Sequence, residues 1–284
     1  MRIHVCGVRG STPAPGAAFI RYGGHTSCLA LAHDGEPPTL LLDAGTGIRR
    51  VPELLDGEPF RGTILLGHLH WDHTQGLPFF TAGDRPDARV EVLMPEQGDA
   101  LAVLARMIAP PFFPVDPTGL RGDWRFAGLA PGVHVIEGFT VLALEIPHKG
   151  GRTFGYRVSD GSGSLAYLSD HGPVALGDGP DGFGPYHPDA VALADGVDVL
   201  FHDAQYTAAE WAARAGFGHS AVDYAVGLAQ RAAARRLMLF HHDPARTDHE
   251  INELVAALAD EGAPLPVEAA AEGTVLTLGA AVQR

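Results

Sequence analysis

Residues 63–73 of this 284-residue chain read Thr-Ile-Leu-Leu-Gly-His-Leu-His-Trp-Asp-His. The apolar residues before Gly67 predict a short β-strand, and three histidines and one aspartate follow where that strand ends. Loops at strand ends hold side chains on a rigid base and leave them accessible, as a catalytic site requires. Imidazole and carboxylate groups together are typical ligands of zinc and similar first-row metal ions.

The spacing of these four residues indicates two metal ions rather than one. His68 and His70 alternate along an extended segment and therefore project to one side of it. Asp72 and His73 face a second point as the chain turns. A polar turn with chance histidines is a much weaker explanation for so many ligand-type residues at this spacing. Four ligands are too few for two ions, so the others should come from later strand ends.

Three later residues stand in the same context as the first motif. His148, Asp170 and His241 each come where an apolar run gives way to a polar turn. Any one of them alone would more often be an ordinary loop residue. Together with residues 68–73 they complete a set of ligands for two ions, and His242 is the alternative ligand to its neighbour His241.

These motifs resemble the metallo-β-lactamase fold superfamily, and within it the branch of ribonuclease Z-like enzymes and cyclic-nucleotide phosphodiesterases. The pattern H-x-H-x-D-H at residues 68–73 carries most of the resemblance, which extends over nearly the whole chain. The other matching stretches are Gly-Ser-Thr-Pro at 10–13, Tyr-Gly-Gly-His-Thr-Ser-Cys at 22–28, Asp-Ala-Gly-Thr-Gly at 43–47, Phe-His-Asp-Ala at 201–204, Gly-His-Ser at 218–220 and Phe-His-His-Asp-Pro at 240–244.

The resemblance implies an α+β fold, in which two mixed β-sheets flanked by helices form an αββα sandwich, and a dinuclear metal site. It favours His241 over His242 as a ligand. Zinc is the expected metal, and manganese or iron would suit the same ligands. The implied ligands are His68, His70 and His148 for one ion, Asp72, His73 and His241 for the other, and Asp170 as the bridge between them.

The rest of the chain is compatible with this architecture as one domain over residues 1–284. Strands precede helices without strict βαβ alternation, which favours two mixed sheets over one parallel sheet. The glycine-rich stretch 177–184 is expected to be a loop inside this domain. Expected strands are 2–8, 26–32, 39–42, 63–66, 90–93, 133–136, 139–146, 153–158, 165–169, 237–240, 267–270 and 274–278. Expected helices are 96–108 and three that begin at the capping boxes of Thr207, Ser220 and Thr247.

Composition restricts the partners of this protein. The net charge of −14 and a single lysine, Lys149, argue against binding of an extended nucleic acid. No apolar stretch is long enough to span a membrane, so no membrane partner is expected. Cys6 and Cys28 lie in apolar segments without a signal peptide before them, which favours two buried thiols in a reducing cytoplasm over a disulfide.

The charge of the expected site favours a small anionic substrate. Two divalent ions, the Asp72 and Asp170 carboxylates and a hydroxide sum to about +1, which a monoanionic phosphodiester neutralises. His219 precedes the helix expected at Ser220, whose N-terminus is locally positive, so it could contact phosphate or protonate the leaving oxygen. The family resemblance implies the same role for His219.

We therefore expect a phosphodiesterase that acts on a cyclic nucleotide or a related small phosphodiester. A hydrolase of a thioester, lactone or lactam would use the same metals without needing His219. A non-catalytic metal-binding carrier or sensor is the third alternative. Only 21 residues separate His148 from Asp170, which leaves no room there for the basic arm with which ribonuclease Z recognises tRNA.

Several other residues are candidates for supporting roles. Three aspartates at strand ends are expected to accept hydrogen bonds from ligand histidines. Three loop residues are expected to line the substrate pocket, although His25 stands where this branch carries asparagine. The apolar stretch 109–115 is expected to cover a small substrate or to form a homodimer contact. The aspartates are Asp43, Asp203 and Asp243, and the loop residues are Ser11, Thr12 and His25.

Overall fold

A computed structural model describes residues 1–173 and 184–279, which form two seven-stranded sheets. The first sheet has the order β14-β1-β2-β3-β4-β5-β6, with β1 (Arg2–Gly7), β2 (Cys28–Ala32), β3 (Leu40–Leu42), β4 (Arg61–Leu65), β5 (Arg89–Pro95), β6 (Asp123–Leu129) and β14 (Val275–Thr277). The second has the order β13-β12-β11-β10-β9-β8-β7, with β7 (Gly132–Ile136), β8 (Phe139–Glu145), β9 (Phe154–Ser159), β10 (Ser164–Leu168), β11 (Val199–Asp203), β12 (Leu237–Phe240) and β13 (Val267–Ala269).

Both sheets combine parallel and antiparallel pairs, as the sequence predicted. Strands β3 to β6 are parallel to one another, whereas β14, β1, β2 and β3 pair antiparallel. In the second sheet β10 to β13 are parallel and β7 to β10 are antiparallel. Parallel neighbours end at the same edge of a sheet, so the segments that follow these strands are brought together there.

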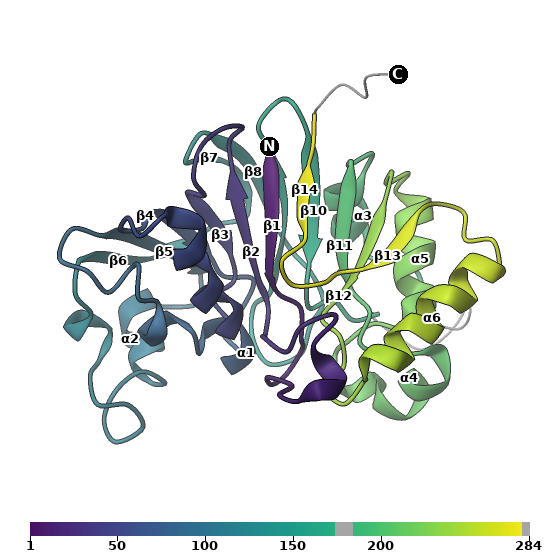
Figure 1. Ribbon diagram of the computed structural model, residues 1–284, viewed down its shortest axis with the longest axis horizontal. Helices are drawn as coiled ribbons and strands as arrows, with labels where there is room; N and C mark the ends of the chain where they lie inside the picture. The colour runs from purple at the N-terminus through teal and green to yellow at the C-terminus, as the bar shows by residue number, and fades with distance from the viewer. Residues whose placement is uncertain (174–183, 280–284) are drawn as a thin grey trace.

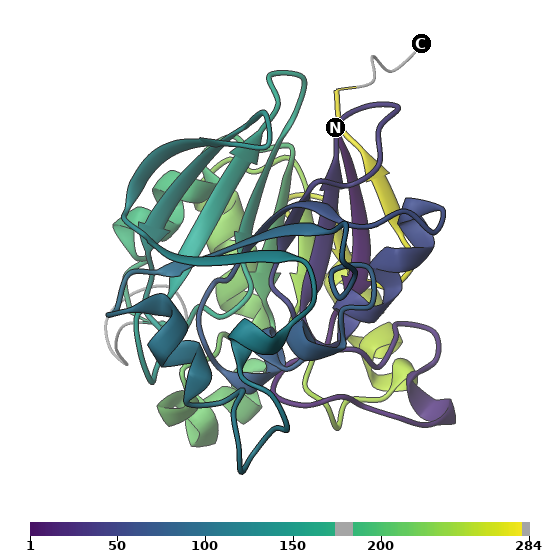
Figure 2. The ribbon, with the colours of Figure 1, turned by 90° about the vertical axis from the view of Figure 1, so that its left-hand side faces the viewer.

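Helices cover the outer face of each sheet and give the αββα sandwich that the resemblance implied (Figure 1). The second sheet carries α3 (Pro188–Ala194), α4 (Ala208–Arg214), α5 (Val222–Arg231) and α6 (Asp248–Asp260). The first sheet carries the 3₁₀ helix η2 (Thr46–Leu55) and α2 (Ala100–Ala105), which lie toward the viewer in Figure 2. No helix within the described ranges is long and apolar enough to cross a membrane.

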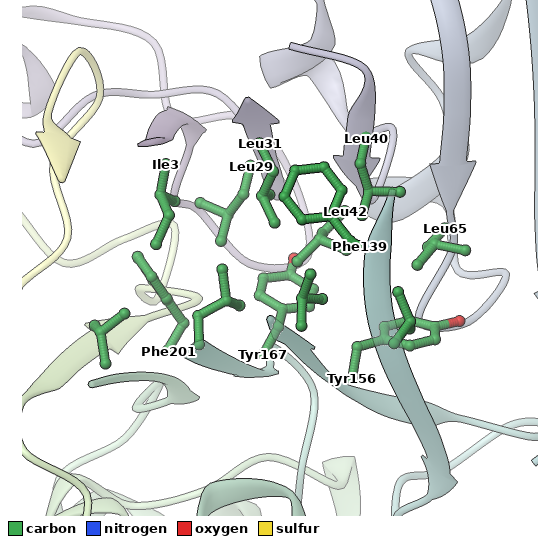
Figure 3. Packing of buried hydrophobic residues seen from close by; sticks show 14 of the residues in the cluster. Ile3, Leu29, Leu31, Leu40, Leu42, Leu65, Phe139, Tyr156, Tyr167 and Phe201 are labelled. Atoms are coloured by element: carbon green, nitrogen blue, oxygen red, sulfur yellow. The ribbon is translucent and has the colours of Figure 1, made fainter. Parts of the chain in front are cut away.

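The core between the sheets is built by alternation along the strands. On β2, Leu29 and Leu31 point into the space between the sheets, while Ala30 points outward to the helices. On β10, Leu165 and Tyr167 point inward in the same way. Figure 3 shows leucines of the first sheet above the rings of Tyr156, Tyr167 and Phe201 from the second. This apolar core holds the two sheets face to face, so that the C-terminal ends of the parallel strands of both sheets lie along the same edge of the sandwich.

The structure corrects several element predictions. The capping boxes at Thr207 and Thr247 are confirmed. The one at Ser220 is wrong, because α5 has Ala221 as its N-cap and the Ser220 hydroxyl donates to the carbonyl of His171 instead. Helix α2 is shorter than expected, and β6, β11 and α3 were not predicted. Of the expected loop 177–184, residues 177–183 lie outside the described ranges.

Candidate metal centre

The predicted ligands come together at the edge where the parallel strands end. Helix α1 (Trp71–Thr74), which follows β4, lies at the lower end of the sheets in Figure 1 and carries Asp72 and His73. The side chains form two groups, and within each group the ligand atoms lie within 4.8 Å of one another. The first group is His68, His70, His148 and Asp170, and the second is Asp72, His73, His241 and Asp170.

Asp170 belongs to both groups and offers a different oxygen to each. Its Oδ2 lies 3.4 Å from His148 Nε2 and 3.6 Å from His68 Nε2. Its Oδ1 lies 2.9 Å from His73 Nε2 and 3.1 Å from His241 Nε2. One carboxylate placed between two sets of histidines is the arrangement that a bridging ligand requires.

The chemistry of this cluster fits divalent cations. Both ring nitrogens of His68 and both carboxylate oxygens of Asp170 are buried and make no hydrogen bond within the described residues. The short distances from the Asp170 oxygens to the histidines are therefore contacts without hydrogen-bond geometry. Unpaired buried polar atoms are costly and call for a partner. Burial alone would lower the pKa of His73, but the Asp170 and Asp72 carboxylates raise it well above its ordinary value. The side chains therefore attract positive charge, which a metal ion would supply.

Hydrogen bonds on the far side of three rings direct Nε2 of each toward the cluster. His73 Nδ1 donates to Asp43 Oδ2 over 2.6 Å, and His148 Nδ1 donates to the carbonyl of Gly218 over 2.7 Å. His241 Nδ1 donates to Gln205 Oε1 over 3.0 Å. Because Nδ1 carries the hydrogen in each case, the lone pair of Nε2 is free to bind a metal.

Asp43 lies where it accepts a hydrogen bond from the candidate ligand His73, and its position is held by residues that the sequence did not reveal. Its oxygens also accept hydrogen bonds from the Gly67 amide at 2.7 Å and the Tyr167 hydroxyl at 2.8 Å. Ser169 lies 3.3 Å away. In the sequence Tyr167 belongs to the expected strand 165–169, and its contact with Asp43 follows only from how the two sheets face each other.

The structure separates the two adjacent histidines after β12. His241 faces the cluster, where its Nε2 lies 3.1 Å from Asp72 Oδ2. His242 points away and contacts the carbonyl of Ala270 at 2.9 Å through its own Nε2. His241 has a positive φ of 56°, a conformation that non-glycine residues seldom adopt. This turn of the backbone is what sends two neighbouring side chains in different directions.

Backbone groups of the loop after β1 also hold the cluster. The Ser11 amide donates to Asp72 Oδ2 over 2.7 Å, and Ser11 has a φ of 61°. A Cβ at Gly10 would lie 2.4 Å from the ring of His241, so only glycine fits there. The Gly-Ser-Thr-Pro stretch thus acts mainly through its backbone, a role that side-chain chemistry in the sequence did not indicate.

His219 lies beside the cluster and forms a pair with Asp203. Its Nδ1 donates to Asp203 Oδ2 over 2.8 Å and lies 3.8 Å from Asp170 Oδ2. Burial would lower the pKa of His219, but Asp203 and the other nearby carboxylates raise it to about 9 in the metal-free chain. His219 lines a cavity of about 380 Å³ above the cluster, together with Ser11, Leu69, His70, Trp71, Asp72 and Asp170.

Four predicted supporting residues have other surroundings. Asp203 contacts His219 rather than a ligand histidine, since its Oδ2 stays 4.0 Å from His241 Nδ1. Asp243 accepts hydrogen bonds from Arg214 and the Ala245 amide and reaches no ligand histidine in the described part of the chain. Among described residues, neither Thr12 nor His25 lines the cavity. The ring of His25 contacts the Thr46 hydroxyl at 3.3 Å instead.

Comparisons with known proteins agree with this geometry. A sequence profile described as "Beta-lactamase superfamily domain" matches residues 39–242. The chain is 29% identical over 282 residues to a ribonuclease Z of Salinibacter ruber, covering 82% of this chain and 85% of that protein. The crystal structure of the metallo-β-lactamase fold protein YhfI from Bacillus subtilis superposes with a TM-score of 0.72 at 17% identity, over 97% of this chain and 99% of that one. Zn(2+)-bound PqqB from Methylobacterium extorquens gives 0.67 at 18% identity, over 98% and 100%.

Proposed function

The chain belongs to the metallo-β-lactamase superfamily, in its ribonuclease Z-like branch, and is a metal-dependent hydrolase; on this basis we propose that it cleaves a small phosphodiester, such as a cyclic nucleotide. Two divalent ions, zinc in the first instance, would polarise the phosphoryl group and supply a nucleophilic water at neutral pH. The side chains proposed to hold them are the two groups that share Asp170.

The observation that carries the proposal is the pair formed by His219 and Asp203 beside the cluster. Cleavage of an alkyl phosphodiester expels an alkoxide, which departs readily only if a proton reaches the leaving oxygen. Asp203 fixes the imidazole of His219 through Nδ1 and stabilises its protonated form, so Nε2 is the atom that would give up the proton. A hydrolase of thioesters has less need of such a donor, because a thiolate departs more readily than an alkoxide.

A small substrate is favoured by the size and charge of the site. The cavity of about 380 Å³ above the cluster suits a phosphoryl group and its immediate substituents. The net charge of −14 disfavours a long polyanion at the surface, whereas the metals would make this pocket locally positive. Lys149, the only lysine, is tied to the carbonyl of Gly216 at 2.8 Å.

The test compares two classes of phosphodiester in the zinc- or manganese-loaded protein. We expect turnover of bis-p-nitrophenyl phosphate and of at least one member of a cyclic-nucleotide panel. His219→Ala should lower kcat for the cyclic nucleotide by about 100-fold to 10,000-fold. The loss should be smaller for the p-nitrophenyl ester, because p-nitrophenolate departs without a proton.

His249→Ala is the matched control, since His249 is a histidine with an 80% exposed side chain on α6 and should leave both rates unchanged. Absence of turnover on every phosphodiester, with two metals bound, would overturn the proposal. Turnover of thioesters or lactones that is insensitive to His219→Ala would establish the acyl-hydrolase alternative instead.

A further inference from the structure

A second, larger hollow adjoins the cavity above the metal cluster. It has a volume of about 710 Å³, against about 380 Å³ for the first. Leu69 and Trp71 line both hollows, and these residues flank the ligand His70. Gly150 also lines the second hollow and packs against His70, so that a Cβ at position 150 would lie 2.7 Å from His70 Nε2. We call this second hollow the aromatic groove, and it opens directly onto the proposed reaction site.

The walls of the aromatic groove expose large rings to solvent. Trp71 is 73% exposed, Phe79 is 58% exposed and Phe112 is 80% exposed. Phe113 packs edge-on against Phe79 with ring centroids 5.7 Å apart. The rings of the groove come from three segments of the chain, at residue 71, residue 79 and residues 112–113. Several exposed rings gathered in one hollow mark a binding site rather than chance surface exposure.

The polar residues of the groove distinguish an aromatic occupant from an aliphatic one. Gln75, Gln97 and Arg106 line the groove with the rings, and Arg106 is the only charged side chain among the described residues of its wall. Amide groups can hydrogen-bond the edge of a heteroaromatic ring, and a guanidinium can stack on its face. The Gln75 amide nitrogen already donates to the Thr26 hydroxyl over 3.3 Å. An alkyl chain would make no hydrogen bond to Gln97 or Arg106, and a second phosphate would find one cation on the described wall.

We propose that the aromatic groove binds the planar heteroaromatic base of the substrate, with Trp71 and Phe112 as stacking residues that determine specificity. This inference rests on the proposed phosphodiesterase function and narrows it to esters that carry a nucleobase. Trp71 stands between the proposed ligands His70 and Asp72, so its backbone is anchored beside the proposed metal centre and its ring starts within reach of a bound phosphodiester.

The first experiment measures binding without metal or phosphate, by ligand-observed NMR titration of the metal-free protein. Adenosine should bind at least tenfold more tightly than ribose. Trp71→Ala and Phe112→Ala should each weaken adenosine binding by about fivefold to 100-fold. Val135→Ala, which removes apolar surface from an exposed position on β7, should change nothing.

The second experiment measures turnover by the zinc-loaded protein on two p-nitrophenyl phosphodiesters, one of thymidine 5′-phosphate and one of methyl phosphate. The nucleoside ester should have the higher kcat/KM, and Phe112→Ala should remove most of that advantage, whereas Val135→Ala should keep it. Base-specific binding without turnover of any ester would refute the proposed function and leave the groove assignment standing.

Three results would overturn the groove assignment itself. The first is equal binding of adenosine and ribose. The second is tighter binding of 1-octanol than of adenosine, with the same sensitivity to Trp71→Ala, which would assign an alkyl occupant. The third is a dimer that Phe112→Ala converts to a monomer without any effect on adenosine binding, which would assign the groove to a second copy of this chain.

Discussion

At the scale of single residues, the metal centre depends on groups that hold the ligands as much as on the ligands themselves. Asp43→Asn should lower zinc affinity by about tenfold to 100-fold, because the carboxylate orients the His73 ring through a 2.6 Å hydrogen bond. Competition with a chromophoric chelator measures this change. Asp243→Asn is the matched control, since the Asp243 carboxylate binds Arg214 and should leave zinc affinity unchanged. Equal losses for the two variants would contradict the assigned role.

Gln205 provides a second prediction at this scale. Gln205→Ala should weaken binding at the ion nearer His241 while sparing the other, because His241 is the candidate ligand that donates to the Gln205 side chain. A zinc titration should then show one site weakened by about tenfold and one site unchanged. Equal weakening at both sites would show that Gln205 acts on the cluster as a whole rather than on one ring.

The clustering of the candidate ligands could be predicted from sequence, and most of the contacts that support them could not. His68, His70, Asp72 and His73 form a compact motif after a strand, and chemistry alone singles them out. Two supporting contacts depend on tertiary distances of a few ångströms. One is the hydrogen bond from the Ser11 amide to Asp72, and the other is the contact of His241 with Gln205 rather than with Asp203. A sequence fixes which residues can bind a metal, but the second layer of contacts is set by the packing of two sheets.

At the scale of elements, the capping box of α6 gives a clean test of local stability. The Thr247 hydroxyl accepts from the Glu250 amide, and the Glu250 carboxylate accepts from the Thr247 amide at 2.7 Å. Thr247→Ala should lower the free energy of unfolding by about 1 kcal/mol, and Thr247→Ser should retain most of it. Urea denaturation measures both variants, and an equal loss in the two would show that the hydroxyl is not the cause.

The turn between β9 and β10 should make stability depend on pH. Burial would raise the pKa of Asp160, but hydrogen bonds from the Ser162 hydroxyl and amide lower it to about 2. A carboxyl whose pKa is lowered by folding stabilises the protein above its unfolded pKa, about 3.9, and loses this contribution as pH falls toward 2. Asp160→Asn should therefore destabilise at pH 7, and the difference from the unsubstituted protein should shrink steadily between about pH 4 and pH 2. A difference of the same size at pH 7 and pH 2 would contradict this prediction.

The sequence located some strands and missed others. Strand β2 is an unbroken apolar run with every residue buried, and the sequence located it. Strand β6, an edge strand with only Leu129 buried, was missed although its polar and apolar residues alternate from Asp123 to Phe126. The Ser220 motif has the letters of a capping box, yet the hydroxyl is used by His171 instead. Local patterns thus compete with tertiary hydrogen bonds, and the sequence alone does not decide between them.

At the scale of the whole molecule, the metal centre joins the two sheets. Asp43 and the motif at 68–73 come from the first sheet, whereas His148, Asp170 and His241 come from the second. Bound metal should therefore stabilise the native chain, by about 4 kcal/mol when free zinc is a thousandfold above its Kd. Chelation should lower Tm, and zinc should restore it. An unchanged Tm would show that the candidate ligands do not bind a metal ion in the folded state.

Crystallography with anomalous scattering at the zinc absorption edge tests whether Asp170 bridges two metal ions. We expect two anomalous peaks per chain at the shared edge of the sheets, with one Asp170 oxygen bound to each ion. His148 should then lie beside one ion and His241 beside the other. A single peak, or two ions neither of which contacts Asp170, would contradict the proposed bridge.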